Sequence, residues 1–570
     1  MFNSKKTQLF VVKETIATTT ASASAFVKAG LEASAKTTSL GNGAVKYTTT
    51  NNSFVDQFGN LSNYRKQRDY SDVDSDMKLL WSQNKLKTVA LTFYIRMITR
   101  VVSFVSGIKT ATSQRGQGLK HEGIFRMMWL GVNQPTTFQK NLPLFITIGS
   151  WKDVITMLSY DLQYNGWEDR KLDWKFLGSV LLGGLENPLT AELVKKYLPQ
   201  IKANKQCKTV EAQADNIIAK WVCSLIFGSK GEDYSKYKEY RKLKSSGTAH
   251  QWQQLISTKN MLSLNFNTIA GRALAQLVSG KFLKNQNLEA TYEAWIDTKP
   301  VAKYTGFVYE LLSPVKSGYN NRPLKSYQEK TINSQFLGLV ETGRNGMKDG
   351  DGGLLVVVDS SSSMTTNVPG LTVSSYDVAK SMALYFSYLL KGRFEGTWME
   401  FNNTAGLKKW TGSTPVSKLQ NDRSESYGST NFQSVAKTFA DIKGQGVAEN
   451  EFPSGILVIS DGCFNNSGRN KTETATLKGN LLKAGFSQDY VSNFKIVIWD
   501  IPNNYYGSTQ TAFEGFADTP NLFYMSGFDG SGIAFVTGTT GATKNPETPK
   551  NAEELFEAAM DQEVLNLIEV

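Results

Sequence analysis

The residues best suited to chemistry are a carboxylate and two hydroxyls at alternate positions, Asp359, Ser361 and Ser363, which directly follow the apolar run LLVVV. Two further segments offer oxygen ligands: GSTNF contains Thr430, and GILVISDGCF contains Asp461 at the end of a second apolar run. Carboxylate and hydroxyl oxygens are hard ligands that suit a small divalent cation. The sequence therefore predicts a metal site, with Mg²⁺ as the first expectation and Mn²⁺ or Ca²⁺ as alternatives.

An open, mostly parallel sheet covered by helices on both faces is expected to position these residues. The predicted strands and helices in this part of the chain are 354–358, 375–390, 396–401, 431–442, 455–460 and 494–499. Continuous Val and Ile runs that alternate with helices are typical of a doubly wound α/β unit. Ligands of such sheets bind at a switch point where strands end, so the three loops are expected to meet there.

Residues from about 55 to 335 show a helical pattern instead. The apolar residues that repeat at three- and four-residue steps between Val89 and Gly107 are Leu91, Tyr94, Ile95, Ile98, Val101, Val102 and Val105. They predict one face of an amphipathic helix. Ser150 followed by Asp153 predicts an N-cap with a capping-box carboxylate at the start of WKDVITMLSYDL.

These patterns predict an α plus α/β chain of four parts. Residues 1–50 are a Thr-, Ser- and Ala-rich arm, and 51–345 are a HEAT-like helical solenoid or ring whose repeats follow no fixed period. Residues 350–545 are the doubly wound α/β domain that carries the metal site. Residues 546–570 are an acidic amphipathic helix expected to pack back on the fold.

Charge is divided unevenly along the chain. Residues 1–350 contain 47 Lys and Arg against 27 Asp and Glu, a net charge of +20, whereas residues 351–570 contain 16 against 24, a net charge of −8. A basic half of this size suits a polyanion, most commonly nucleic acid, although basic helix surfaces also serve solubility. The residues expected to contact RNA are Arg96, Arg100, Arg115, Lys120, His121, Arg126, Arg241, Lys242 and Lys244.

Several other classes of function are disfavoured by composition. Three cysteines and two histidines are too few for a disulfide framework or a Cys/His zinc cluster. Arg96 and Arg100 interrupt the most apolar long segment, so no membrane span is expected. The N-terminus lacks the pattern of a signal peptide, and a cytoplasmic protein is therefore expected. His121 and Glu122 have no nucleophile partner by motif, so the sequence does not indicate an enzyme.

The metal motif resembles the metal-ion-dependent adhesion site of von Willebrand factor A domains. The shared pattern is DxSxS, a Thr in a Gly-rich loop and an Asp–Gly pair after an apolar strand, with Ser362 replacing the usual Gly between the serines. The resemblance implies that Asp359, Ser361 and Ser363 coordinate the cation directly and that Thr430 and Asp461 bind it directly or through water. GFDGSG at 527–532 resembles the C-terminal part of this domain in Ro-type proteins.

The helical half resembles the Ro60-like TROVE and TROVE-like families. The segments that carry this resemblance are GNGAVKYTTTNNSFVDQFGNL, GLKHEGIFRMMWLG with LPLFITIGSWKDVI, and YKEYRKLKSS. In that family the A domain closes a basic ring of HEAT-type repeats. The resemblance implies a scaffold or chaperone that binds small noncoding or misfolded RNA without catalysis. The alternative is a metal-dependent adhesion or assembly protein of a phage particle that captures an acidic residue of a protein partner.

Overall fold

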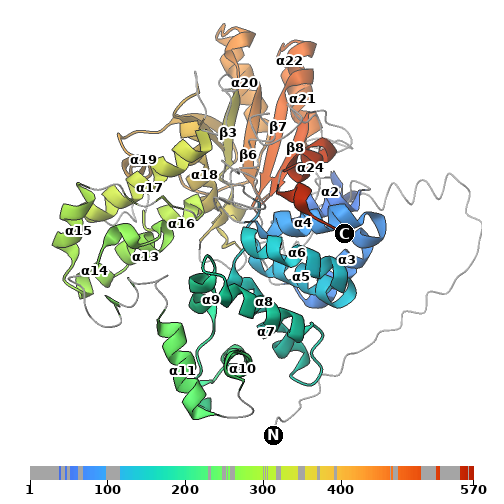
Figure 1. Cartoon of the computed structure of the whole chain (residues 1–570). Coiled ribbons are helices and arrows are strands. Elements are labelled where there is room, and N and C mark those ends of the chain that lie inside the picture. The colour runs from blue at the N-terminus through green and yellow to red at the C-terminus, as the bar shows by residue number, and fades with distance from the viewer. Residues whose placement is uncertain are drawn as a thin grey trace, which may run out of the picture.

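A computed structural model of the chain describes most of the helical half and of the predicted α/β unit (Figure 1). The described residues are 37–39, 45–47, 52–61, 68–97, 116–228, 233–246, 252, 255–256, 264–298, 301, 303–304, 306–315, 323–344, 353–368, 373–389, 394–461, 464–465, 473–501, 521–526, 552–562 and 564–570. None of the helices in these ranges is long and apolar enough to cross a membrane. Within the N-terminal arm, Thr37–Ser39 (β1) and Val45–Tyr47 (β2) pair antiparallel.

The C-terminal half contains a mixed sheet whose strands lie in the order β5-β4-β3-β6-β7-β8. These strands are Leu354–Asp359 (β3), Thr397–Phe401 (β4), Ala405–Lys409 (β5), Gly455–Ser460 (β6), Lys495–Asp500 (β7) and Leu522–Ser526 (β8). Every neighbouring pair is parallel except β4 with β5, which is antiparallel. The predicted mostly parallel sheet is therefore confirmed.

Helices cover both faces of this sheet because its strands are apolar on both sides. The helices next to the sheet are Ser375–Leu389 (α18), Pro415–Asn421 (α19), Gln433–Gly444 (α20), Glu473–Lys483 (α21) and Gln488–Asn493 (α22). On β3, Val356 and Val358 belong to the core shared with α18, whereas Leu355 and Val357 belong to the core shared with α20 and α21. Side chains alternate between the faces of a strand, so a buried strand needs apolar residues at successive positions.

The helical half begins with a pack of successive helices. They are Ser53–Gly59 (α2), Tyr70–Gln83 (α3), Lys85–Arg96 (α4), Lys120–Asn133 (α5), Pro135–Ile148 (α6), Trp151–Asn165 (α7), Trp174–Glu186 (α8), Ala191–Tyr197 (α9), Val210–Phe227 (α10) and Tyr234–Ser245 (α11). Most contacts join helices that are neighbours or near neighbours in the chain, such as α4 with α5 and α5 with α7.

A second, smaller helical pack has a core of its own. Its helices are Gly271–Ser279 (α13), Phe282–Asn285 (α14), Glu289–Ile296 (α15), Val308–Leu312 (α16) and Ser326–Arg344 (α17). Phe266, Leu274, Tyr292 and Tyr327 form part of this core. Helix α17 continues toward the sheet unit, where it contacts α18 and α19.

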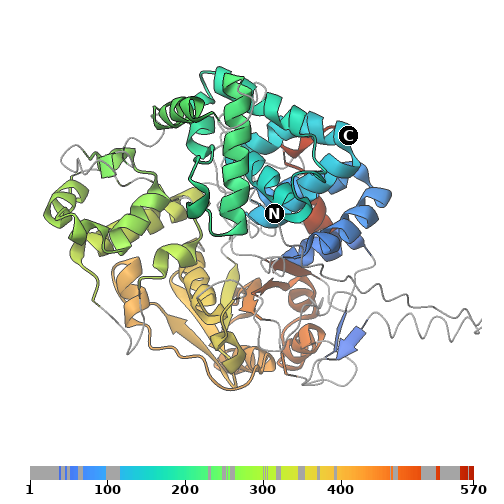
Figure 2. The ribbon, with the colours of Figure 1, turned by 90° about the horizontal axis from the view of Figure 1, so that it is seen from below.

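The helical region is attached to the sheet unit at both of its ends. At the N-terminal end, α2 contacts β8 and the C-terminal helix Ala552–Met560 (α24), and α24 also packs on α4. At the other end, α16 and α17 contact α18. Seen from below, the helices and the sheet unit follow one another around the molecule (Figure 2). The expectation that the C-terminal helix packs back on the fold is confirmed.

In the helical half, one local prediction is confirmed and another is corrected. The capping box is confirmed, since the Asp153 carboxylate accepts a 3.0 Å hydrogen bond from the Ser150 N–H at the start of α7. The expected amphipathic helix from Val89 to Gly107 is corrected. Helix α4 ends at Arg96 and is buried on all sides from Thr88 onward, because α2, α3, α5, α6 and α24 surround it. The later part of the expected helix, from Ile98, lies outside the described residues.

Candidate metal centre and basic surface

The sheet has its switch point at β3, which pairs in parallel with β4 on one side and with β6 on the other. The chain therefore leaves β3 and β6 at the same edge of the sheet. Asp359 is the last residue of β3, Ser460 is the last of β6, and Asp461 follows it. The carboxyl ends of parallel strands at such a point are the usual ligand position.

Asp359 organises the first loop and is completely buried. One carboxylate oxygen, Oδ1, accepts a hydrogen bond of 2.8 Å from the Ser361 N–H, and the other, Oδ2, accepts one of 2.5 Å from the Ser460 hydroxyl. The hydroxyl oxygens of Ser361 and Ser363 lie 3.0 Å apart. Three of the predicted ligands therefore form one compact group at the end of β3.

The loop that carries Thr430 is bonded to the loop after β3. The N–H and the hydroxyl of Ser362 both donate to the Gly428 carbonyl, over 3.1 and 3.0 Å. Tyr427 donates its N–H to the Ser360 carbonyl over 2.8 Å. Gly428 has a φ of +79°, and only glycine adopts this backbone geometry without strain. The sequence GST thus permits the turn that brings Thr430 toward the end of β3.

The loop after β6 is tied to the same place. Asn465 donates its N–H to the Thr430 carbonyl over 2.8 Å, and the Thr430 N–H points at the Asn465 side-chain oxygen over 3.4 Å. Thr430 is buried, and Asp461 is half-buried. The structure therefore assembles the loops of all five predicted ligands at one edge of the sheet. Their role as metal ligands stays a prediction.

The electrostatics at this edge favour a cation. Burial raises the pKa of Asp359 from its ordinary value, and the nearby negative charge of Asp461 raises it further. The hydrogen bonds from Ser460 and Ser361 oppose this shift because they stabilise the carboxylate. A buried carboxylate next to a second carboxylate is costly, and a divalent cation between them would remove that cost.

The donor set also fits a small, hard cation by its spacing. The Ser361 and Ser363 hydroxyls are hydrogen-bonded to each other over 3.0 Å. They are therefore close enough to be adjacent ligands of one octahedral cation, whose ligand oxygens lie about 3 Å apart. The described residues contain no group of three or more His, Cys, Asp or Glu side chains placed to hold a metal. A cation here would rest on two carboxylates and three hydroxyls, which suits Mg²⁺, Mn²⁺ or Ca²⁺ better than zinc.

Sequence reasoning missed three residues that position the ligands: Ser460, Gly428 and Asn465. Ser460 could have been found, since a hydroxyl residue ends an otherwise apolar strand next to Asp461. Gly428 was visible as a turn residue before Thr430. The bond between Asn465 and Thr430 joins residues 35 apart in the chain, and no local pattern indicates it.

Two of the predicted RNA contacts are wrong because the structure buries them. The Arg96 guanidinium, whose side chain is 3% exposed, pairs with the fully buried Asp153 over 2.7 Å. Arg126 is fully buried, pairs with Glu122 over 2.8 Å and donates to Gln57 over 2.7 Å. Both arginines hold helices together and are inaccessible to nucleic acid.

Lys120 and His121 begin α5 and lie beside α7. Partial burial lowers the pKa of Lys120 to about 8, and the cations Lys152 and Arg96 add to this effect. His121 Nδ1 is hydrogen-bonded to the Tyr160 hydroxyl. Burial, followed by the charge of Lys120, lowers the pKa of His121. These two side chains remain candidates for contacts with an anionic ligand.

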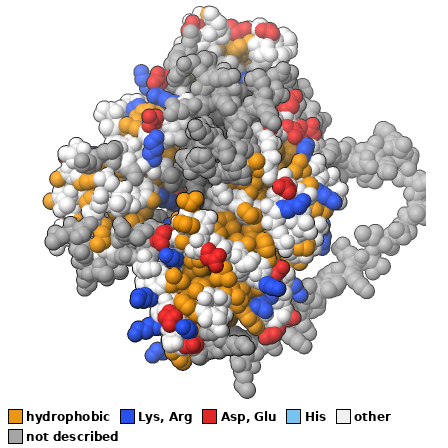
Figure 3. All heavy atoms as spheres, viewed as in Figure 1, with side chains coloured by type: hydrophobic (Ala, Val, Ile, Leu, Met, Phe, Trp, Pro, Cys, Tyr) orange, Lys and Arg blue, Asp and Glu red, His pale blue; other side chains and the backbone are white. Residues whose placement is uncertain are grey.

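The remaining predicted contacts belong to α11 or fall outside the described residues. Arg241 and Lys242 are exposed, whereas Lys244 is half-buried and donates to the Lys196 carbonyl over 3.4 Å. Arg100 and Arg115 lie outside the described residues. On the face in Figure 3, Lys and Arg side chains are scattered along the lower helices around an apolar area and form no continuous patch.

Comparison with known proteins adds no relative. No protein-family model matches the chain, and no curated protein matches it. Function is therefore inferred from the geometry and the charges of the molecule itself.

Proposed function

We propose that the chain is a non-catalytic, Ro-type RNA-binding scaffold whose sheet unit is a von Willebrand factor A domain with a divalent-cation site. The observation that carries the metal site is the convergence of three loops, which bear Asp359, Thr430 and Asp461, at the switch point of the sheet. The strand order with one antiparallel edge strand, β5, is compatible with the A-domain assignment.

The proposed cation site would act by binding and not by catalysis. Asp359, Ser361 and Ser363 would hold Mg²⁺ together with Thr430 and Asp461. The cation would supply a Lewis-acidic position for an oxygen of a partner. The chain's own contribution is preorganisation. Ser460 orients the Asp359 carboxylate, and the hydrogen bonds of Ser362 to Gly428 hold the loop after β3 against the loop that carries Thr430.

RNA binding is proposed for the helical half. Its support is the net charge of +20 over residues 1–350, compared with −8 over the remainder. The contacts of the helical region with the sheet unit at both ends are compatible with a HEAT-like ring closed by an A domain. Arg96 and Arg126 are excluded because they are buried. The described residues that could contact phosphate are then Lys120, His121, Arg241 and Lys242, with a smaller role for Lys244.

A salt titration of RNA binding by the intact protein tests this proposal. The probes are a small structured RNA and a duplex with a single-stranded end. Neutralised phosphates release counterions, so affinity should fall steeply with salt, with a log-log slope of about 0.7 per contact on single strands. The double variant Arg241→Ala with Lys242→Ala should bind more weakly and with a shallower slope.

The matched control for charge is Lys409→Ala with Lys437→Ala, two exposed lysines of the sheet unit. This control should bind RNA as the wild type does. No binding of either RNA at low salt would overturn the proposed function. An equal loss in both double variants would mean that only the total charge matters and that α11 is not a contact surface.

A metal-dependent protein-binding role is the second candidate. It is favoured by the exposure of Ser362 and of Tyr427, which is 59% exposed, on the loops that carry the ligands. An acidic side chain of a partner, for example in a phage particle, could approach a cation over these residues. This role predicts a host protein that co-purifies with the wild type in Mg²⁺, dissociates in EDTA and is absent from Asp359→Ala.

A further inference from the structure

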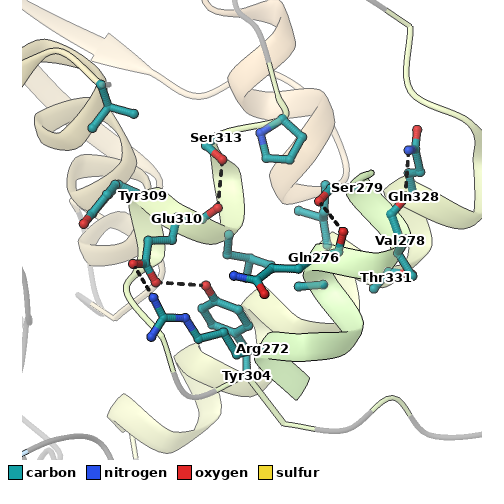
Figure 4. A pocket seen from close by; sticks show the side chains of 15 residues that line it. Arg272, Gln276, Val278, Ser279, Tyr304, Tyr309, Glu310, Ser313, Gln328 and Thr331 are labelled. Carbon is teal, nitrogen blue, oxygen red and sulfur yellow. Dashed lines mark hydrogen bonds and ion pairs between the residues drawn. The ribbon is translucent and has the colours of Figure 1, made fainter. Parts of the chain in front are cut away.

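A cavity of about 310 Å³ lies between α13, α16 and α17 (Figure 4). Val373, from the segment before α18, closes one side of it. Its volume is at the lower end of the range of small-molecule sites, about 300 to 1,000 Å³. The lining mixes apolar side chains with neutral polar ones and contains a single Arg and a single Glu.

The charged end of the cavity is already neutralised. The Arg272 guanidinium pairs with Glu310 over 2.7 Å, and the Tyr304 hydroxyl donates to the other oxygen of Glu310 over 3.3 Å. Glu310 also accepts from the Phe307 N–H over 3.4 Å. This end of the cavity therefore offers no free charge to a phosphate or a carboxylate, and the buried Tyr304 ring forms part of its wall.

Gln276 is the polar group that is available to a ligand. Its amide end points into the cavity beside Tyr304 in Figure 4, and the side chain has no hydrogen-bond partner within the described part of the chain. The other glutamine of the lining, Gln328, is occupied: it donates to the Val278 carbonyl over 3.0 Å and accepts from the Lys325 N–H over 3.1 Å. A carboxamide offers a donor and an acceptor side by side.

We propose that this cavity binds a purine or pyrimidine base, with the Gln276 carboxamide bonded to the base edge and the ring packed against Tyr304. This proposal rests on the proposed RNA-binding function. A base is planar and uncharged, and its edge carries neighbouring donors and acceptors that an amide matches in pairs. Unstacked RNA bases are commonly held by aromatic rings together with such edge contacts.

Other small ligands fit this lining less well. A phosphate needs unpaired cations, and Arg272 is paired with Glu310. Gln276 is exposed, and a purely apolar ligand would cover its amide without offering it a hydrogen bond, whereas the edge of a base would offer one. The apolar floor of Val278, Leu311 and Ile332 suits the flat face of a ring. The base could come from a free nucleoside or from an extruded nucleotide of an RNA strand.

Binding of the four common ribonucleosides to the full chain tests the proposal. Titration calorimetry and ligand-observed NMR measure this binding. At least one nucleoside should bind the wild type, and Gln276→Ala should weaken it at least tenfold, the usual effect of losing a paired edge contact. The matched control is Gln139→Ala, an exposed glutamine of α6, which should bind as the wild type does. Gln276→Leu, which keeps the side-chain volume, should fail as Gln276→Ala does.

A second arm distinguishes the source of the base. If the cavity takes an RNA base, the nucleoside should compete with a short single-stranded RNA, and Gln276→Ala should weaken that RNA too. If the cavity takes a free nucleoside, neither the added nucleoside nor Gln276→Ala should change RNA binding. The proposal is overturned if no nucleoside binds or if Gln276→Ala binds as well as Gln139→Ala does. Nucleoside binding without any RNA binding would leave the cavity assigned and refute the RNA-binding function alone.

Discussion

Two buried arginines of the helical region and the buried Asp359 of the sheet unit have different charged neighbours. In the helical region, Arg96 and Arg126 are buried, and each has a carboxylate partner, Asp153 or Glu122, within 2.8 Å. At the end of β3, Asp359 is equally buried, but its described hydrogen bonds come from hydroxyl and N–H groups, and the nearest charge that affects it is another carboxylate. The paired charges hold helices together, whereas the second carboxylate beside Asp359 makes a bound cation favourable at the end of β3.

The largest expected effect comes from breaking a buried pair in the helical region. Arg96→Ala leaves Asp153 buried without a cation, and such a loss lowers the free energy of unfolding by about 3 to 5 kcal/mol. Urea unfolding followed by circular dichroism measures it. The exposed Lys242→Ala serves as the control and should change stability by about 0.5 kcal/mol or less. Equal effects in the two variants would show that the buried pair is no more structural than a surface lysine.

The next effect concerns the sheet unit and its response to metal. Because the predicted ligands come from three loops, a cation should bind only the folded chain. Mg²⁺ at a hundredfold excess over its dissociation constant should then stabilise the wild type by about 2.7 kcal/mol. Asp359→Ala should abolish this response, yet melt at a higher temperature than the wild type in EDTA, because it removes a buried carboxylate next to Asp461.

Ser361→Ala separates loss of the metal from loss of charge. It removes a neutral ligand, so it should weaken the response to Mg²⁺ without gaining stability in EDTA. Thermal melts of all three proteins in Mg²⁺, Mn²⁺ and EDTA provide the comparison. A wild-type melting temperature that is indifferent to all three conditions would mean that the fold is present and its metal function absent.

The sequence predicted the parts of the molecule that depend on long local patterns. The apolar runs of β3, β6 and β7 are buried on both faces and were recognised as strands. Strands β5 and β8, the two edge strands of the sheet, were missed. Strand β5 pairs only with β4, and its short sequence AGLKK has no continuous apolar run. The capping box of α7 was predicted from two residues, since its geometry is local.

Arg96 and Arg126 show where sequence reasoning fails. Helical periodicity assigns residues to faces of a helix, but it does not say how many neighbours cover that helix. Because five helices surround α4, Arg96 is buried although its neighbours in the sequence suggested an exposed flank. The same limit applied at the metal site, where the ligand types were predictable and the supporting bond between Asn465 and Thr430 was not.

The pH dependence of stability should differ with and without metal: stability should fall with rising pH in EDTA and stay nearly constant in saturating Mg²⁺. The pKa of Asp359 is raised in the folded chain, so the metal-free protein should become more stable as pH falls through this pKa toward the ordinary carboxyl value. Protons compete with the cation for the same carboxylate, so stabilisation by Mg²⁺ should grow as pH rises. Below the pKa of Asp359, each pH unit should change the stabilisation by Mg²⁺ by about 1.4 kcal/mol. Melts at several pH values in Mg²⁺ and EDTA measure both trends, and Asp359→Ala should flatten them. Parallel trends in the two conditions would rule out Asp359 as the shared site.

The smallest expected effect tests whether the two regions are independent where they are joined. Near the C-terminus, Asn141 of α6 donates to the Glu569 carbonyl over 2.5 Å and accepts from the Glu569 N–H over 3.1 Å. Asn141→Ala removes both bonds and should lower the free energy of unfolding by about 1 kcal/mol. It should leave the Mg²⁺-induced rise in melting temperature unchanged, because the bonds lie on the helical side and touch no predicted ligand.

Gln139→Ala, on the same helix and exposed, controls for the loss of a polar side chain. A reduced response to Mg²⁺ in Asn141→Ala, but not in Gln139→Ala, would show that the metal site depends on how the C-terminal segment is anchored. The helical region and the sheet unit would then be one energetically coupled unit.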